Sequence, residues 1–395
     1  MRQVIDDIIV YGDPVDPGAL EQIQRCRDTA AVACLMGDHH KGYAVPIGGV
    51  VAYVDAISPS GVGYDIGCGN KAVLTDADAG HVRTHIAKIM DSIQSRISFG
   101  MGRANGVSVD HDLFEDPIWK CQSNKFMHSL LGLARSQLGT VGSGNHYVDV
   151  FTDEQDRVWV GCHFGSRGLG HKIASEVLRR GEAKDGMDVD PLVLSVRSDL
   201  GSQYLKMMEV AGRYAYAGRD WVCDEVCRIL GAKKLDEVHN HHNYAWNETH
   251  GGQEFWVVRK GATPAFPGQR GFVGGSMGDD SVILEGVDHE ESRACLYSTV
   301  HGAGRVMSRT EARGKVDRKT GEVKSQGRIS RQMMDDWIRP LGVELRGADV
   351  DESPYCYKRL DAVLRHHGNT VRVLHTLKPI GVAMAGKDTR DLYAD

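Results

Sequence analysis

Short apolar runs bounded by polar residues or glycine recur along the chain and are typical of β-strands. They are Gly49–Asp55, Lys71–Thr75, His146–Phe151, Arg157–His163, Glu254–Arg259 and Ser281–Glu285. Apolar residues spaced three and four apart predict helices instead. These stretches are His81–Ile97, Asn124–Gln137, His171–Arg179 and a long one from about Pro191 to Leu230, which its glycines should divide into several helices. Because the strands come in groups, the order favours an α+β fold over a doubly wound sheet.

Glycine is the second pattern, with 47 glycines among 395 residues, well above the average of about 7%. The glycines cluster with His, Asp, Asn and Ser in loops that span residues 37 to 304. Such loops bring backbone amides close to phosphates and metal ions. We therefore expect one composite domain over residues 1–395, with mixed or antiparallel sheets surrounded by helices. Within it, Gly314–Gly327 is predicted to form a polar hairpin or mobile loop.

Composition excludes several classes of protein. No apolar segment approaches the roughly 18 residues that span a bilayer, and the N-terminus lacks the layout of a signal peptide. Nine scattered cysteines do not form a secreted disulfide framework, so we expect a cytoplasmic protein without a membrane. The net charge of −6 argues against general nucleic-acid binding, but Arg305–Arg331 holds nine basic residues against three acidic ones. That segment is either a phosphate-backbone contact or a solvated loop.

Candidate metal ligands stand in the glycine-rich loops. Asp65 and Cys68 lie three residues apart in SPSGVGYDIGCGNK, His146 lies in VGSGNHYV, His163 in GCHFGSRGLG and His242 in HNHHNYAW. Carboxylate, thiolate and neutral imidazole are the usual ligands of divalent transition ions. Taken singly, each histidine is more often a hydrogen-bonded structural residue. We interpret His239 and His241 in that ordinary way.

Eight ordered motifs give these residues a common context. They are DHHKGYAVPIGG, SPSGVGYDIGCG, GSGNH, HFGSRGLG, HHN, RKGA, GSMG and HGAGRVMSR. In this order the chain resembles the RtcB-type RNA ligases of tRNA splicing and RNA repair, from about residue 30 to residue 384. The resemblance implies that Asp65, Cys68, His146, His163 and His242 bind two Mn²⁺ ions, with the thiolate shared between them. It also implies that His301 is the nucleophile that attacks GTP and becomes guanylylated.

The resemblance extends to contacts with the nucleotide and with phosphates. It places these residues in the guanylate pocket: Asn145, Asp149, Gly275, Ser276, Met277, His301, Ala303, Gly304 and Tyr357. Candidate RNA or phosphate contacts are Arg167, Lys260 and Arg305, together with Asp38, which matches the family's acidic residue near the active site and could instead orient a ligand or the histidine. Two positions depart from the family pattern. Asp149 replaces the common glutamate, and Met384 stands where the family has a lysine that contacts guanine, so Lys387 is the candidate substitute.

The implied reaction joins an RNA that ends in a 2′,3′-cyclic phosphate or 3′-phosphate to an RNA with a 5′-hydroxyl, through a histidyl-GMP intermediate. One alternative is a metal-dependent cyclic phosphodiesterase that processes RNA ends without sealing them, which would keep the five ligands and not need His301. Another is a non-catalytic RNA-binding protein with the same fold. The intact HGAGR motif counts against both. The physiological RNA, a need for an archease-like activator and the oligomeric state stay open.

Overall fold

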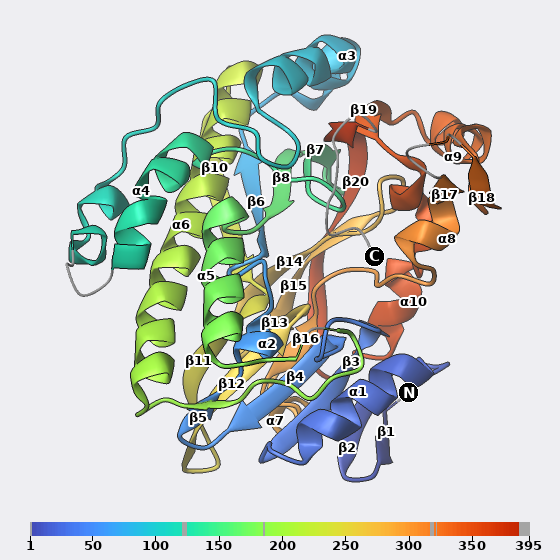
Figure 1. Cartoon of the computed structure of the whole chain (residues 1–395). Helices are drawn as coiled ribbons and strands as arrows, with labels where there is room; N and C mark the ends of the chain where they lie inside the picture. Colours follow the sequence, from blue (N-terminus) through green and yellow to red (C-terminus); the bar gives the residue numbers. More distant parts are fainter. Residues whose placement is uncertain (1, 121–124, 185, 317–319, 321, 387–395) are drawn as a thin grey trace.

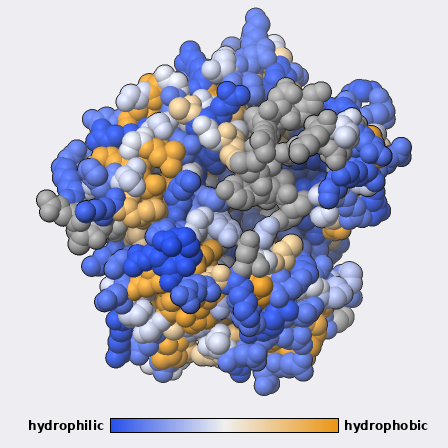
Figure 2. Space-filling model, viewed as in Figure 1, coloured by the Kyte–Doolittle hydropathy of each residue, from blue (hydrophilic) through white to orange (hydrophobic). Residues whose placement is uncertain are grey.

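The computed structural model describes residues 2–120, 125–184, 186–316, 320 and 322–386. Two large sheets and surrounding helices form an α+β fold, which confirms the predicted fold class (Figure 1). All six strands predicted from apolar runs are present, with ends that shift by one or two residues. None of the helices in these ranges is both long and apolar enough to cross a membrane. The face in Figure 2 is mainly hydrophilic, with separate hydrophobic patches over α4–α6.

The first sheet has six strands in the order β1-β2-β3-β4-β12-β11. Their bounds are Arg2–Ile5, Ile8–Tyr11, Val32–His40, Ile47–Tyr53, Gln253–Lys260 and Asn243–His250 in that order. Only the β2–β3 pair is parallel. Helix α1 (Pro17–Arg27) packs on this sheet through Ala19, Ile23 and Cys26, which are fully buried.

The second sheet has eight strands in the order β10-β6-β8-β7-β20-β15-β14, with β19 paired to β20. The bounds in that order are Lys234–His241, Gly69–Thr75, Val158–Phe164, Tyr147–Thr152, Val371–Gly386, Ser281–Gly286 and Arg270–Val273, with β19 at Glu344–Ala348. Strands β6, β7 and β8 are buried along their whole length, because helices α3 (Ala79–Arg96) and α6 (Asp199–Leu230) share a core with them.

Smaller elements complete the chain. Three short ribbons pair β5 (Ala56–Ile57) with β9 (Leu194–Ser195), β13 (Ala262–Pro264) with β16 (Ser298–Val300), and β17 (Gly314–Val316) with β18 (Val323–Gln326). The last pair is the hairpin form of the 314–327 segment. The other helices are α2 (Pro59–Val62), α4 (Lys125–Gln137), α5 (Arg167–Arg180), α7 (Glu290–Ala294), α8 (Arg309–Arg313), α9 (Arg331–Ile338) and α10 (Leu360–Arg365).

Helix α6 corrects one prediction, because its glycines do not break it. It runs unbroken for 32 residues, and Gly201, Gly212 and Gly218 are buried within it. A Cβ at Gly212 would lie 2.8 Å from the Tyr244 ring, and one at Gly218 would lie 3.2 Å from the Phe164 ring. These glycines therefore let strands approach the helix closely, and the packing offsets their low helix propensity.

The same substitution at two helical glycines should have opposite effects on stability. Gly212→Ala should lower the free energy of unfolding by about 1–3 kcal/mol, because the new methyl group overpacks the contact with Tyr244. Gly132→Ala in α4 should raise it by about 0.5–1 kcal/mol, since nothing lies within 4 Å of the added atom. Denaturant unfolding of both variants measures this. Equal shifts would contradict the packing role of Gly212.

Candidate active site

Four neighbouring strands begin or end at one edge of the eight-stranded sheet. Along the order β10, β6, β8, β7 every pair is antiparallel. Cys68 directly precedes β6 and His146 directly precedes β7, while His163 is the penultimate residue of β8 and His242 directly follows β10. Adjacent strands lie only about 4.8 Å apart. Side chains from four distant parts of the sequence therefore meet at this edge.

The ligand atoms of the five predicted metal-binding residues lie together. Cys68 Sγ is 3.3 Å from His163 Nε2 and 3.6 Å from His146 Nε2. His242 Nε2 lies 3.2 Å from His163 Nε2, and Asp65 Oδ2 lies 3.2 Å from His146 Nε2. Cys68, His146 and His163 by themselves offer three ligand atoms within 4.8 Å of one another. The fold thus supplies one compact set of S, N and O donors.

Burial favours the neutral, metal-binding form of His163 and His242. Burial lowers the pKa of His163 to about 3, and it lowers the pKa of His242 well below the ordinary value. His163 Nδ1 donates to the carbonyl of Asn145 at 3.0 Å, so the lone pair on Nε2 faces the cluster. Asn145 thus orients a candidate ligand through its backbone.

The residues present fit a divalent ion. His146 Nδ1 and His242 Nδ1 are buried, and neither has a hydrogen-bond partner among the described residues. Burial raises the pKa of the Cys68 thiol well above its ordinary value, and the charge of Asp65 raises it further. A cation bound to the sulfur would supply the charge that stabilises the thiolate. One thiolate, one carboxylate and three imidazoles form a donor set for transition ions.

His301 lies beside this cluster and is held by Asp38. Its ring centroid is 4.8 Å from that of His242. Its Nδ1 donates to Asp38 Oδ2 at 2.6 Å, and the same oxygen accepts from the backbone N–H groups of His301 and Gly302 at 3.0 and 3.2 Å. Burial alone would raise the pKa of Asp38, but the charge and hydrogen bonds of His301 outweigh it and lower that pKa. Asp38 is fully buried, and this geometry favours the prediction that it orients the histidine.

The loop after His301 packs against strand β3. Gly304 has a φ of +76°, and a Cβ there would overlap the carbonyl oxygen of Asp38, so only glycine fits. Ala303 is buried beside it. The Gly304 carbonyl accepts from the N–H of Lys358 at 2.9 Å, and Arg305 forms an isolated bridge with Tyr357. The HGAGR loop is thus fixed between β3 and the 356–358 segment.

Asp149 and Tyr357 are the predicted guanine contacts. Asp149 is buried, its Oδ1 has no hydrogen-bond partner among the described residues, and burial raises its pKa well above the ordinary value. Tyr357 donates its hydroxyl hydrogen to Glu352 and carries the Arg305 guanidinium 5.0 Å from its ring centroid. The carboxyl of Asp149 thus has hydrogen-bonding capacity left for a ligand, whereas Arg305 lies over the Tyr357 ring.

The GSMG loop lies beside these residues, and its side chains mostly have partners within the protein. Gly274 bridges Gly302, and Gly275 donates its N–H to Ser281 Oγ at 3.0 Å. Ser276 donates to Asp279 Oδ2 at 2.7 Å. Met277 and Met384 are buried in one apolar cluster with Tyr147. Met384 therefore offers guanine no polar atom, and the proposed substitute Lys387 lies outside the described residues.

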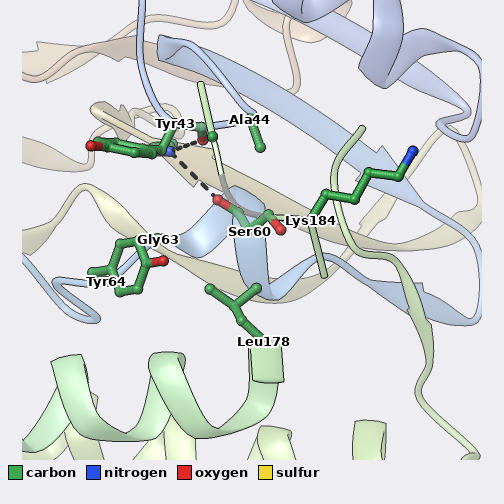
Figure 3. A pocket seen from close by; sticks show the side chains of 9 residues that line it. Tyr43, Ala44, Ser60, Gly63, Tyr64, Leu178 and Lys184 are labelled. Atoms are coloured by element: carbon green, nitrogen blue, oxygen red, sulfur yellow. Dashed lines mark hydrogen bonds between the residues drawn. The ribbon is translucent and has the colours of Figure 1, made fainter. Parts of the chain in front are cut away.

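The predicted phosphate contacts separate into two groups. Arg167 has a strained φ of +57°, and a Cβ at Gly142 would overlap both its guanidinium and the His146 ring, so it lies next to the cluster. Lys260 instead donates to the carbonyls of Tyr43 and Ser60, at 2.7 and 3.5 Å, in a small pocket beside α2 and α5 (Figure 3). Arg305 donates to Tyr357 Oη and to the Asp351 and Met307 carbonyls. For Lys260 and Arg305 the geometry favours structural roles.

The basic segment Arg305–Arg331 is also less cationic than its sequence suggests. Arg309 pairs with Asp351 and Glu352, and Arg313 pairs with Asp349 and Asp351. Arg328 pairs with Glu311 and Arg331 with Asp335. Acidic residues beyond residue 331 thus neutralise part of the positive charge of Arg305–Arg331. Arg318 and Lys319 lie outside the described residues.

Three residues of the site were missed by sequence reasoning. Arg219 on α6 bonds to segments that carry the ligands. Lys358 donates to the carbonyls of Gly37 and His39, on either side of Asp38, at 3.1 and 3.0 Å. Arg309 packs over Gly144 of the GSGNH loop, where a Cβ would lie 2.8 Å from its guanidinium. The one available signal was for Arg219, a charged residue on the apolar stripe of a helix.

Known proteins are similar to this chain along most of its length. The family described as tRNA-splicing ligase RtcB matches residues 19–385. The RNA-splicing ligase RtcB of Escherichia coli K12 is 31% identical over 403 residues, covering 93% of this chain and 94% of that protein. The tRNA-splicing ligase RtcB of Thermococcus kodakarensis is 29% identical over 470 residues, covering 95% and 94%.

These matches along nearly the whole chain identify an enzyme of the RNA ligase class. The chain belongs to the RtcB family. This confirms the resemblance drawn from the eight motifs.

Replacing Cys68 tests whether the cluster binds metal. Cys68→Ala should weaken Mn²⁺ binding by roughly 100-fold or more. Loss of a residue that only hydrogen-bonds to a metal ligand already lowers metal affinity by about 10–100-fold, and loss of a ligand should lower it further. Equilibrium dialysis with metal analysis measures the loss. Cys26→Ala removes a thiol that is also buried but lies in the α1 core, and should bind like the parent. Unchanged binding by Cys68→Ala would contradict a ligand role.

Proposed function

We propose that this protein is a GTP- and Mn²⁺-dependent ligase that joins RNA ends bearing a 2′,3′-cyclic phosphate or 3′-phosphate to 5′-hydroxyl ends. The observation that carries the proposal is the position of His301. Its ring lies beside His242 of the donor cluster, and its Nδ1 is held by a buried carboxylate. A nucleophile, the group that orients it and a metal-binding cluster thus adjoin one another.

The Asp38–His301 pair gives the imidazole its reactive form. Because Nδ1 donates to Asp38, the neutral ring carries its lone pair on Nε2. As positive charge develops on the ring during attack, the Asp38 carboxylate stabilises it. The two backbone N–H groups that also bond to Oδ2 keep that carboxylate in place. His301 is therefore oriented for nucleophilic attack without a conformational change of its own.

In the first step Nε2 of His301 attacks the α-phosphorus of GTP. An N–P bond forms, the bond from that phosphorus to the β-phosphate oxygen breaks, and pyrophosphate leaves. Gly302 and Gly304 allow the loop backbone to approach the phosphate. The product is histidyl-GMP, in which the ring nitrogen is a good leaving group for the next transfer.

Two further transfers complete sealing. Water first opens a cyclic phosphate to a 3′-phosphate. An oxygen of this phosphate attacks the GMP phosphorus, the N–P bond breaks, and His301 is regenerated. The 5′-hydroxyl then attacks the RNA phosphorus, its proton passes to solvent or a nearby base, and GMP leaves.

The donor cluster is proposed to hold two Mn²⁺ ions, through Asp65, Cys68, His146, His163 and His242. Bound there, they would offset phosphate charge and lower the pKa of an attacking water or hydroxyl. The chain's own contribution is to bring the three imidazoles together and to favour the neutral form of His163 and His242 by burial. Asn145 orients His163 through its carbonyl.

Selectivity for GTP is proposed to rest on Asp149. Its Oδ1 is buried without a partner among the described residues, and guanine offers N1–H and a 2-amino group that adenine lacks. Tyr357 can contribute its ring to the same purine. Arg167 is the favoured contact with an RNA phosphate, since guanidinium binds phosphate in a bidentate manner. The chain would then act as one composite domain, since both sheets contribute to the site.

His301→Ala tests the proposal directly. The variant should form no covalent GMP adduct and seal no RNA, while its metal content stays near that of the parent, because His301 lies outside the ligand set. Intact-protein mass spectrometry after incubation with GTP and Mn²⁺ detects the adduct, and metal analysis gives the control. An adduct on the variant, or loss of its metal, would overturn the assignment of the nucleophile.

Asp38→Asn tests the orientation of the ring. We expect guanylylation to slow by roughly 100-fold or more, because the amide can hold the wrong tautomer and offers no charge. Metal binding and GTP binding should change little. Single-turnover adduct formation measures the rate, and a rate equal to that of the parent would show that Asp38 is dispensable.

A further inference from the structure

Arg219 lies in the middle of α6 and is fully buried. Among the described residues it forms no salt bridge with a carboxylate. A buried charge without a counter-charge is costly unless hydrogen bonds satisfy it. The chain keeps this arginine on a helical face that is otherwise apolar, which calls for a specific reason.

The guanidinium makes four hydrogen bonds, all to neutral acceptors. Nη1 donates to the carbonyl of Gly67 at 2.9 Å and to the carbonyl of Phe164 at 2.6 Å. Nε donates to His239 Nε2 at 2.8 Å, and Nη2 lies 2.9 Å from His241 Nδ1, which also lies 2.9 Å from the Gly67 carbonyl. One planar group thus ties α6 to three separate segments of the chain.

Each of these segments carries a candidate metal ligand next to the bonded residue. Gly67 precedes Cys68, Phe164 follows His163, and His241 precedes His242. The three ligands come from β6, β8 and β10, which are adjacent in the sheet. Arg219 therefore bonds to the backbone next to Cys68 and His163, and to the side chain next to His242, from the side that faces the helix.

The loop before Cys68 is shaped for this contact. Gly67 has a φ of +72°, and a Cβ there would lie 3.1 Å from Ala215 Cβ and 3.2 Å from Gly212 Cα. Glycine at both 67 and 212 lets the loop lie directly on α6, within reach of the guanidinium. The close approach of this loop to α6 is what allows Arg219 to bond to it.

The same bonds define the roles of His239 and His241. Since arginine can only donate, His239 Nε2 accepts from it. His241 Nδ1 lies 2.9 Å from both Arg219 Nη2 and the Gly67 carbonyl, so it accepts from Arg219 only in the tautomer that does not donate to Gly67. These histidines, adjacent to a ligand in sequence, are thus bonded to Arg219.

We propose that Arg219 is a positioning residue of the metal centre, which holds the segments of Cys68, His163 and His242 so that all three can bind the same pair of ions. The proposal rests on the proposed metal site. Only a guanidinium, with three nitrogens in one plane, can contact both carbonyls and both imidazoles. A lysine has a single nitrogen and cannot reach all four at once.

The test uses Co²⁺ on the full-length, metal-stripped protein, since Co²⁺ bound to a thiolate gives a sulfur-to-metal charge-transfer band. Arg219→Lys should bind Co²⁺ 10–100-fold more weakly than the parent, as expected for loss of a partner that orients ligands, with a weakened band. His241→Leu removes one acceptor and is the milder variant if Arg219→Lys fails to fold. It should show a smaller loss in the same direction.

Arg259→Lys is the matched control. Arg259 is also fully buried, but it pairs with Glu248 and with Ser298 and Leu296. It should lose stability while binding Co²⁺ like the parent. Parental affinity and an unchanged band in Arg219→Lys or His241→Leu would overturn the positioning role alone. A parent protein without the band would overturn the metal site itself, and the inference with it.

Discussion

The active site depends on the antiparallel pairing of β10, β6, β8 and β7. Because alternate strands run in opposite directions, their ends meet at one edge, and each contributes one donor there. His242 stands at the single residue between β10 and β11, where the chain passes from the eight-stranded to the six-stranded sheet. A slip of one residue in any of these pairs would turn that strand's donor to the opposite face of the sheet. The long buried runs of β6, β7 and β8 oppose such a slip, so core packing fixes the positions of the ligands.

The proposed nucleophile, His301, depends on a second junction, between β3 and the segments after β16. Asp38 comes from the six-stranded sheet, His301 follows β16, and Lys358 reaches the carbonyls on either side of Asp38 from beyond residue 350. The His301 ring is thus held from the N-terminal sheet and placed beside His242, which joins the two sheets. His242 therefore belongs to the proposed metal site and also lies next to the proposed nucleophile. That arrangement explains why the motifs spread over most of the chain and yet form one site.

The sequence predicted most local elements and selected five residues that the fold brings together, and it failed where the answer depended on distant partners. Apolar runs were sufficient for the strands, because a strand buried on both faces must be apolar throughout. Gly212 and Gly218 were misread as helix breakers, since the rings of Tyr244 and Phe164 that require them lie far away in sequence. The charge of Arg309 and Arg313 was overestimated for the same reason, because Asp349, Asp351 and Glu352 neutralise it from outside the window. Lys260 and Arg305 stand within motifs, but motif membership does not reveal whether a side chain points to substrate or to a carbonyl.

The charged residues around the cluster affect one another's ionisation. Asp65 and Cys68 can bring two negative charges to the cluster, and Arg219 places a buried positive charge near Cys68. If the guanidinium bonded to a carboxylate, the two charges would cancel. Carbonyls and imidazoles are neutral, so they accept hydrogen bonds from its N–H groups without cancelling its positive charge. The charge of Arg219 offsets part of the rise that burial and Asp65 cause in the pKa of the Cys68 thiol. Orientation and electrostatics are thus provided by one residue, which explains why a costly buried cation is retained on an apolar helix face.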